Sequence, residues 1–313
     1  MANYRFAAMM LLSSFAALAG PKPAAAPKRT TFVLAHKPMA PPKQIKPTPP
    51  TVLVHFASGW KKGGPLNLVV HFHGIQNCVS ATVEKGSASC PGAGAGTAHG
   101  LIAQLDASGA NAVLIAMEVA YRQNNTDAGN LEKPGFFKSV IDDALAEINT
   151  LKGTSYSSGK INKLILTSHS GGYEALIESA VNGGLDVKSI FLMDSFYPTK
   201  DKCAKRKCTP ADKKKNDDCA TKYLDWITGG SGRKFVNIYS AGGGTKAGSQ
   251  LLAADAQAAG VAVETFGNKQ QNDKPKAAAG ASFGKPVVFF FSKHIHDDIP
   301  RNYFGTVVAK LVR

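Results

Sequence analysis

The fold of this chain is decided by the stretch LILTSHSGGY, which covers residues 164–173. An apolar strand pattern runs into a tight turn at Ser170, and a helical pattern follows. The residues that flank Ser170 in such a turn must be small; Gly172 meets that need, and Ser168 stands where glycine is commoner. The turn directs the Ser170 hydroxyl out of the sheet, and the helix N-terminus favours negative charge nearby. The stretch predicts a nucleophilic serine, the alternative being a glycine-rich turn with a chance serine.

Short apolar runs alternate with helical patterns on both sides of this stretch. Most of the runs are continuously hydrophobic, which strands covered by helices on both faces require. The alternation predicts an α/β fold in which helices cover both faces of a doubly wound, mostly parallel sheet. The predicted strands are residues 52–56, 66–72, 112–117, 163–167, 188–193, 234–239 and 286–291. The predicted helices are residues 97–107, 135–151, 172–181, 249–258 and 302–311.

The length and composition suit one large domain. The chain has 313 residues, 44% of them hydrophobic, which is enough to bury the core of a single α/β domain. Residues 20–50 hold nine of the seventeen prolines and predict an extended linker, although residues 31–35 have the pattern of a short edge strand. We therefore expect the folded domain at residues 51–313.

The first nineteen residues have the pattern of a signal peptide. A positively charged start precedes the apolar run Phe6–Leu18, and small residues precede a cleavage site at Gly20. A second site at Ala24–Ala26 is less attractive because Pro27 would follow the cut. The apolar run is too short for a stable transmembrane span. We expect export to the periplasm or the medium and no stable span after cleavage, with an uncleaved membrane anchor as the alternative.

The five cysteines fit an oxidising compartment. Cys78 and Cys90 lie around one loop, and Cys203, Cys208 and Cys219 lie together in another. Two disulfides and one leftover thiol are the simplest arrangement, and the second pairing stays open. Zinc is disfavoured because the later three cysteines have no Cys-x-x-Cys spacing and no histidine nearby.

Residues 201–222 interrupt the alternation of strands and helices. The segment contains eight Lys or Arg, four Asp and three Cys, with almost no apolar residues. It predicts a surface insertion, which is either a solvated, disulfide-stapled loop or a basic rim beside the active site. Such a rim attracts anionic substrates or cell-envelope polymers. Nucleic acid is disfavoured as a partner because no aromatic residues are interleaved with the charges.

The base that a nucleophilic serine needs is expected from the loop after the last strand. Only His294 and His296, of the eight histidines, follow a strand at the carboxyl end without strain. We favour His296, which lies deeper in a loop rich in aspartate, and keep His294 as the alternative. His169 is adjacent to Ser170, but neighbouring side chains in such a turn point apart, so we expect it to be packed against the sheet.

The acid that orients the base is expected at the end of another strand. Asp194 follows the strand 188–193 directly, whereas the next strand runs into a glycine-rich segment without a carboxylate. Asp297 or Asp298 would serve only if their loop folds back, and Glu118 follows a different strand. Asp194 is therefore the preferred acid, its alternative role being that of a helix cap or turn residue.

An oxyanion hole would complete the site. One donor is the backbone N–H of Gly171, and the other is expected in the loop after strand 66–72, where Gly74 lets the N–H of Ile75 face the substrate. His73 is expected to hold this loop, and His71 to be a packed core residue. The glycine-rich run 241–245 lacks the phosphate-loop lysine and the dinucleotide spacing, so nucleotide binding is unsupported. A serine nucleophile with its base, acid and oxyanion donors needs no metal or organic cofactor, so we predict neither.

The histidine–glycine loop, serine turn, acid and late histidine, in this order, resemble the α/β-hydrolase superfamily over roughly residues 51–313. The SHSGGY turn is similar to that of bacterial exported hydrolases. The resemblance implies a Ser–His–acid mechanism for Ser170, His296 and Asp194. There are two departures: Ser168 replaces the usual first glycine, and the acid follows an earlier strand than is common.

We therefore predict a secreted or periplasmic serine hydrolase that cleaves a small or polymeric carboxylic ester through an acyl-enzyme. The alternatives are a peptidase or amidase with the same triad, an acyltransferase, and a non-catalytic protein that binds envelope polymers. Aromatic residues in or near the loops are interpreted as core packing rather than specific contacts; they are Tyr121, Phe136, Phe137, Phe196, Tyr197 and Trp226.

Overall fold

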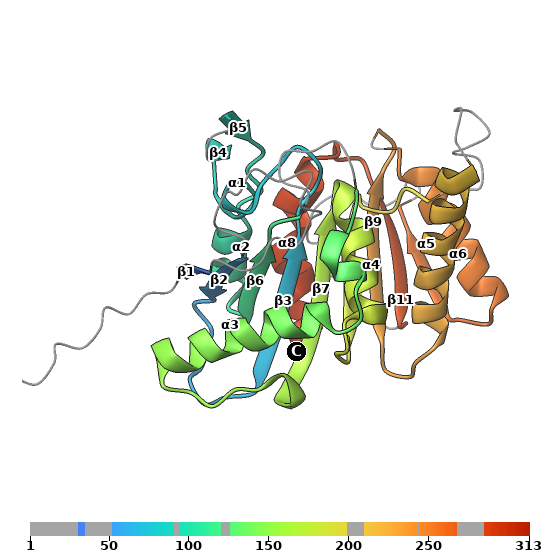
Figure 1. Cartoon of the computed structure of the whole chain (residues 1–313). Coiled ribbons are helices and arrows are strands. Elements are labelled where there is room, and N and C mark those ends of the chain that lie inside the picture. The colour runs from blue at the N-terminus through green and yellow to red at the C-terminus, as the bar shows by residue number, and fades with distance from the viewer. Residues whose placement is uncertain are drawn as a thin grey trace, which may run out of the picture.

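A nine-stranded sheet is the centre of the molecule (Figure 1). The structure is a computed structural model that describes residues 31–34, 52–90, 94–119, 126–198, 210–242, 244–267 and 285–313. The strand order is β1-β2-β6-β3-β7-β8-β9-β11-β10. The strands are β1 (Thr31–Leu34), β2 (Val52–Phe56), β3 (Leu66–Phe72), β6 (Val113–Met117), β7 (Ile161–His169), β8 (Ser189–Met193), β9 (Lys234–Ser240), β10 (Val263–Phe266) and β11 (Val287–Ser292).

The sheet is mostly parallel, as the continuous apolar runs predicted. Among the described strands of this sheet, β2 has the direction opposite to that of the others, since it pairs antiparallel with both β1 and β6. The central strand β3 is buried along its whole length, and so is β8. The backbone groups of these strands pair within the sheet while their side chains are covered on both faces, which explains why the predicted strands were apolar at nearly every position.

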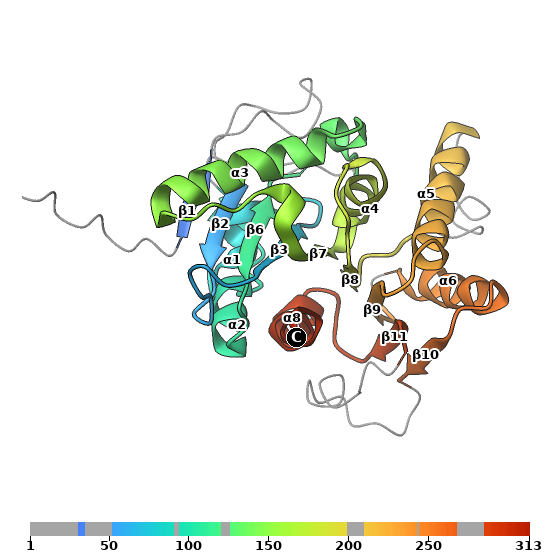
Figure 2. The ribbon, with the colours of Figure 1, turned by 90° about the horizontal axis from the view of Figure 1, so that it is seen from below.

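Helices cover both faces of the sheet (Figure 2). The buried apolar side chains form two separate cores. One core contains side chains of α3, α4, α5 and α6, including Phe137, Leu176, Trp226 and Leu252. The other contains side chains of α1, α2 and α8, including Leu101 and Tyr303. The prediction of an α/β fold with helices on both faces is therefore confirmed. The helices are α1 (Val79–Val83), α2 (Leu101–Ser108), α3 (Phe136–Lys152), α4 (Tyr173–Asn182), α5 (Pro210–Thr228), α6 (Lys246–Ala258) and α8 (Asp298–Val312).

The sheet begins earlier in the chain than residue 51. β1 lies in the segment that the prolines assigned to a linker, and it pairs with β2 from Thr31 opposite His55 to Leu34 opposite Val52. The edge-strand pattern at residues 31–35 therefore describes this segment better than the linker does. The predicted signal peptide and the rest of the linker lie outside the described residues.

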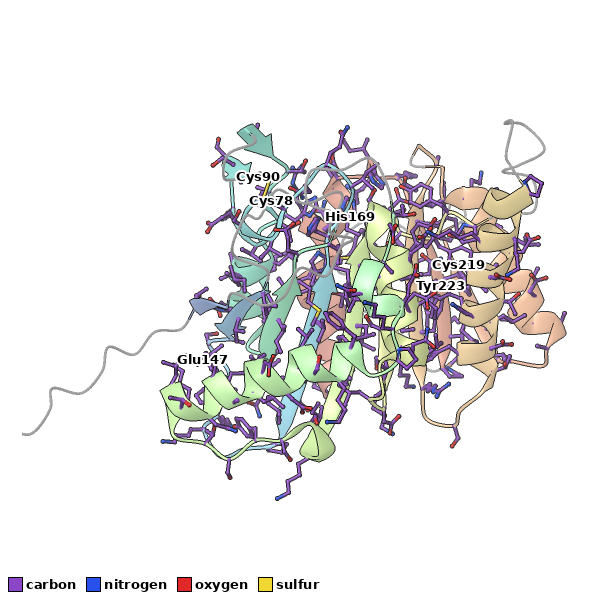
Figure 3. All side chains as sticks on the ribbon, viewed as in Figure 1. Cys78, Cys90, Glu147, His169, Cys219 and Tyr223 are labelled. Carbon is purple, nitrogen blue, oxygen red and sulfur yellow. A yellow bond between two sulfur atoms is a disulfide. The ribbon has the colours of Figure 1, made fainter. Side chains whose placement is uncertain are left out.

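The loop around the first cysteine pair forms a small hairpin. β4 (Ala88–Cys90) pairs with β5 (Gly94–Gly96), and the disulfide Cys78–Cys90 joins this hairpin to the start of α1. In Figure 3 this disulfide lies at the same end of the sheet as His169. The hairpin is a surface excursion beside the end of the sheet that carries the predicted site.

The predicted insertion at residues 201–222 is not a loop over the part that the structure describes. From Pro210 it forms α5, which packs on α4 through residues beyond the charged segment, such as Tyr223 and Trp226. Cys219 is a buried free thiol (Figure 3), so it staples nothing, and Cys203 and Cys208 lie outside the described residues. Lysines of α5 pair with acids in the protein: Lys215 with Glu174 at 2.8 Å and Lys222 with Glu178 at 2.5 Å.

Within the ranges described above, no helix combines the length and the apolar character that crossing a membrane requires.

Candidate active site

The predicted site residues follow four parallel strands that end at one edge of the sheet. The parallel strands β3, β7, β8 and β11 end there, and the chain continues into Gly74, Ser170, Asp194 and His296 respectively. Because parallel strands present their carboxyl ends at the same edge, segments more than 200 residues apart in the chain meet there.

Backbone strain is concentrated in these loops. In the part of the chain that the structure describes, three non-glycine residues have φ in the left-handed region: Gln76 at 55°, Ser170 at 51° and Asp194 at 48°. Such conformations are uncommon for residues with a Cβ and persist only where the surroundings enforce them, often at functional sites. The strained Ser170 is the geometry expected of a nucleophile on a strand-to-helix turn.

Three glycines let the turn at Ser170 lie against the loop after β3. A Cβ on Gly74 would lie 2.7 Å from Ser170 Cβ, and a Cβ on Gly171 would lie 2.5 Å from Ile75 Cγ2. A Cβ on Gly172 would collide with the carbonyl oxygen of Phe72. The small residues around Ser170 are therefore explained by close backbone approach, and the turn and the predicted oxyanion loop are in direct contact.

Ser168, the departure from the usual first glycine, has a partner of its own. Its hydroxyl lies 2.7 Å from that of Ser195, and Ser195 Oγ donates a 2.7 Å hydrogen bond to the carbonyl oxygen of Ser170. All three side chains are buried. The hydroxyl at position 168 is thus accommodated by a serine from the loop after β8, which also fixes the backbone of the turn.

Asp194 and His296 are joined directly. His296 Nδ1 lies 2.7 Å from Asp194 Oδ2. The fully buried carboxylate also accepts hydrogen bonds from Ser240 N–H at 2.8 Å, from Ser240 Oγ at 2.6 Å and from Thr245 Oγ1. Burial alone would raise the pKa of Asp194, but the hydrogen bonds from His296, Ser240 and Thr245 hold it below its usual value. Asp194 is therefore an ionised group that orients the imidazole.

The alternative bases and acids lie elsewhere. His294 packs its ring edge-on to that of Tyr303, at 5.7 Å between centroids. Asp298 pairs with Arg301 at 2.8 Å, and Asp297 Oδ1 lies 4.0 Å from His169 Nε2. Of the predicted candidates, the structure brings together Asp194 and His296, with Glu118 bound to the loop after β3 instead.

That loop is held by two buried side chains. His73 Nδ1 donates to the carbonyl oxygen of Gly74 at 2.7 Å, and His73 Nε2 lies 2.5 Å from Glu118 Oε1. The second oxygen of Glu118 accepts the N–H of Val79 at 3.0 Å, at the start of α1. His73 thus holds the loop as the sequence predicted. Ile75 N lies 3.3 Å from the place where a Cβ on Gly171 would stand, so the two predicted oxyanion donors are neighbours.

Tyr197 is a further residue at the site, which the sequence assigned to core packing. Its hydroxyl lies 3.4 Å from Ser170 Oγ and 3.5 Å from His296 Nε2. In the described part of the chain, Ser170 Oγ has no hydrogen bond to His296. Phe137, Phe196 and Trp226 are core residues as predicted, and Tyr121 lies outside the described residues.

Several histidines near the predicted site are buried. His71 is fully buried and its Nδ1 lies 2.9 Å from Thr167 Oγ1, as expected of a packed core histidine. The ring of His169 lies 4.5 Å from those of both His99 and His296, and His169 Nε2 donates to the carbonyl oxygen of His296 at 3.2 Å. His169 is therefore buried, as predicted, but the contacts that the structure describes are with His99 and with the loop that carries His296.

One group of side chains has the composition of a metal site. Ligand atoms of His99, His169 and Asp297 lie within 4.8 Å of one another. His169 already donates a hydrogen bond to the carbonyl oxygen of His296. Burial lowers the pKa of His99, and the positive charge of Arg301 lowers it further. A cation bound there would compete with the hydrogen bond from His169 and would be repelled by the charge of Arg301. The arrangement therefore fits a support for the His296 loop better than a metal site.

Comparisons with known proteins name no family for this chain. No protein-family model matches the chain, and neither does any curated protein. Among solved structures, a feruloyl esterase module from Clostridium thermocellum is 11% identical, with 83% of this chain and 81% of that one aligned and a TM-score of 0.48. An S-formylglutathione hydrolase from Agrobacterium tumefaciens is 10% identical, covers 83% of this chain and 88% of its own length, and has a TM-score of 0.44.

An acylaminoacyl peptidase from Pyrococcus horikoshii is 11% identical, with a TM-score of 0.47. The alignment covers 83% of this chain and 38% of the peptidase, so this chain spans less than half of that protein. The assignment of the fold rests on the chain's own geometry: a strained serine turn after a central strand, a glycine loop beside it, and the order serine, aspartate, histidine. By these features the chain has the α/β-hydrolase fold.

Proposed function

We propose that this chain is a serine hydrolase that cleaves carboxylic esters through an acyl-enzyme, with Ser170 as the nucleophile. The observation that carries the proposal is the 2.7 Å contact between His296 and the buried Asp194, at the edge where Ser170 stands on a strained turn. A carboxylate with four hydrogen-bond donors, one of them an imidazole, supports the cation that forms when the imidazole takes a proton.

In the proposed mechanism, His296 Nε2 takes the proton of Ser170 Oγ, and the oxygen attacks the ester carbonyl. Asp194 keeps the imidazole in the tautomer in which Nε2 carries no proton, and it stabilises the resulting cation. The N–H groups of Gly171 and Ile75 receive the negative oxygen of the tetrahedral intermediate, each contributing about 3 kcal/mol. His296 then protonates the leaving alcohol, and water repeats the sequence to release the acid.

The test is a screen of p-nitrophenyl esters and peptidyl amides together with a fluorophosphonate probe. The wild-type protein should be labelled by the probe and should hydrolyse esters, and Ser170→Ala should show neither labelling nor hydrolysis. His296→Ala should abolish both, while the matched change His294→Ala, two residues away in the same loop, should leave both in place. A folded wild type that stays unlabelled would favour a binding protein, and faster cleavage of amides than of esters would identify a peptidase or amidase.

Two exposed apolar side chains support an apolar group in the substrate. Among the described residues, Ile75 and Ile295 are 39% and 68% exposed, and they lie in the loops that carry the proposed oxyanion donor and the base. We expect an apolar part of the substrate to contact them, because removing apolar surface from water on binding is favourable. The same ester screen, with acyl chains of increasing length, should therefore show a rise in kcat/KM that Ile295→Ser reduces.

We further propose export from the cytoplasm. The disulfide Cys78–Cys90 is of the kind that persists in oxidising compartments, and the first nineteen residues have the composition of a signal peptide. N-terminal sequencing of the protein from cytoplasmic, periplasmic and culture fractions tests this proposal. A start at Gly20 supports it, and an intact Met1 in the cytoplasmic fraction contradicts it.

An anionic polymer of the cell envelope is the partner that we propose for the basic segment 201–222. Co-sedimentation with purified envelope fractions should be lost in high salt and in a variant with Lys205, Arg206 and Lys207 changed to glutamate. Equal sedimentation of variant and wild type would dismiss this partner.

A further inference from the structure

Tyr197 holds its hydroxyl in the space between the proposed nucleophile and the proposed base. The oxygen lies 3.4 Å from Ser170 Oγ and 3.5 Å from His296 Nε2, both at the long end of hydrogen-bond distance. Catalytic hydrogen bonds are often long before substrate binds, so these distances are compatible with a role in the reaction. The hydroxyl therefore neighbours the two atoms between which protons must move.

The position of the ring is determined by its surroundings. Tyr197 follows Asp194 by three residues in the loop after β8, and its ring lies 5.7 Å from that of Tyr173 and 6.4 Å from that of His296. Burial raises the pKa of Tyr197 to about 12, although the hydrogen bond with Ser170 opposes the rise. The phenol therefore keeps its proton, and remains a hydrogen-bond donor, at any pH at which an ester is hydrolysed in a cell.

The reaction itself places an oxygen near this hydroxyl. When the tetrahedral intermediate collapses, the leaving oxygen must face His296 Nε2, because that atom supplies its proton, and it is bonded to the same carbon as Ser170 Oγ. A group within reach of both Ser170 Oγ and His296 Nε2 is therefore also within reach of the leaving oxygen. In deacylation the attacking water takes the same place.

We propose that Tyr197 is a catalytic residue whose hydroxyl donates a hydrogen bond to the leaving oxygen of the ester as the carbon–oxygen bond breaks. The bonding pair goes to the leaving oxygen, His296 transfers to it the proton taken from Ser170, and Tyr197 retains its own proton throughout. This inference rests on the proposed serine hydrolase function. The hydrogen bond from Tyr197 favours esters whose leaving oxygen develops a strong negative charge.

The test compares two esters of the same acid on Tyr197→Phe: an alkyl ester and a p-nitrophenyl ester. An alkoxide leaving group concentrates charge on one oxygen, whereas p-nitrophenolate spreads it over the ring. The variant should therefore lose about 10- to 100-fold in kcat/KM on the alkyl ester, the value of one hydrogen bond to a charged oxygen. The p-nitrophenyl ester and the rate of fluorophosphonate labelling should change much less.

The ratio of the two kcat/KM values is independent of the fraction of folded enzyme, so partial misfolding of the variant does not affect it. Tyr173→Phe is the matched control, because its hydroxyl bonds to Glu174 at 3.1 Å; its ratio should equal that of wild type. An equal loss on both esters and on labelling, in a variant that is folded by circular dichroism, would mean that Tyr197 relays the proton from Ser170. Unchanged kcat/KM values on both esters would mean that it plays no part. Either result overturns the inference, whereas a wild type inactive on both esters would overturn the proposed function.

Discussion

Acid should destabilise this protein through the histidines beneath its active site, and His99 allows the size of the effect to be worked out. His99 is 2% exposed, its Nε2 has no hydrogen-bond partner, and burial, then the charge of Arg301, lowers its pKa from 6.5 to about 3. The unfolded chain therefore binds a proton at His99 that the native protein does not bind between these two pH values. Stability contributed by the neutral imidazole is complete above pH 6.5 and falls as the pH decreases below it.

The expected loss follows from the difference in pKa. Between pH 6.5 and pH 5 the free energy of unfolding should fall by about 1.4 kcal/mol per pH unit, or about 2 kcal/mol in total for this one group. Unfolding in urea, followed by tryptophan fluorescence at pH 7 and pH 5, measures the fall. His99→Phe retains an aromatic ring against His169 but removes the titration, so its stability should fall by about 2 kcal/mol less than that of wild type.

The result that would refute this reasoning is an equal fall in wild type and variant. His71→Phe serves as a second case, because burial holds the pKa of His71 well below its usual value. If neither variant resists acid better than wild type, the buried histidines are not the source of the sensitivity.

Three further predictions concern the site and its supports. Asp194→Asn should lower kcat about 10³- to 10⁴-fold, because the amide no longer holds the His296 tautomer, while Asp297→Asn should lower kcat less than about fivefold, as expected of a half-exposed side chain. Similar losses in the two variants would mean that the acid has been misassigned. Gly171→Ala should lower kcat about 100- to 1,000-fold without loss of folding, because the new Cβ would lie 2.5 Å from Ile75 Cγ2 and displace an oxyanion donor, whereas Gly159→Ala, which has open space around it, should be neutral. Cys78→Ser should reduce the free energy of unfolding by about 3 kcal/mol, and dithiothreitol should destabilise wild type but not this variant; a wild type that is indifferent to the reductant would contradict the prediction.

The parallel strands could be predicted because burial on both faces leaves a direct mark in the sequence. All seven predicted strands are present within a few residues, from Val52–Phe56 to Val287–Ser292, and so are the five predicted helices. β1 was ambiguous because four residues among prolines carry little pattern, and its pairing with β2 depends on a partner distant in the chain. The helix α5 was missed because Cys219 is buried within the charged segment but gives no apolar stripe by itself, and large buried residues such as Tyr223 and Trp226 follow the segment.

The site divides in the same way. The positions of Ser170, Asp194 and His296 at strand ends were predictable, since a parallel sheet gathers its carboxyl ends. The supporting hydroxyls were not. Ser240 precedes the glycine-rich run 241–245 and Thr245 ends it, and both donate hydrogen bonds to Asp194, which follows the neighbouring strand β8. Serine, threonine and tyrosine are common in loops, so only proximity in the folded protein distinguishes a donor from a solvated residue.

The loop after β8 concentrates three tasks in four residues. Asp194 contacts the imidazole of His296, Ser195 donates a hydrogen bond to the carbonyl oxygen of Ser170, and the hydroxyl of Tyr197 lies beside Ser170 Oγ, where we propose that it acts on the leaving oxygen. A change in the length of this segment would disturb all three at once. A point substitution at position 197 is therefore the change in this loop that leaves Asp194 and Ser195 in place.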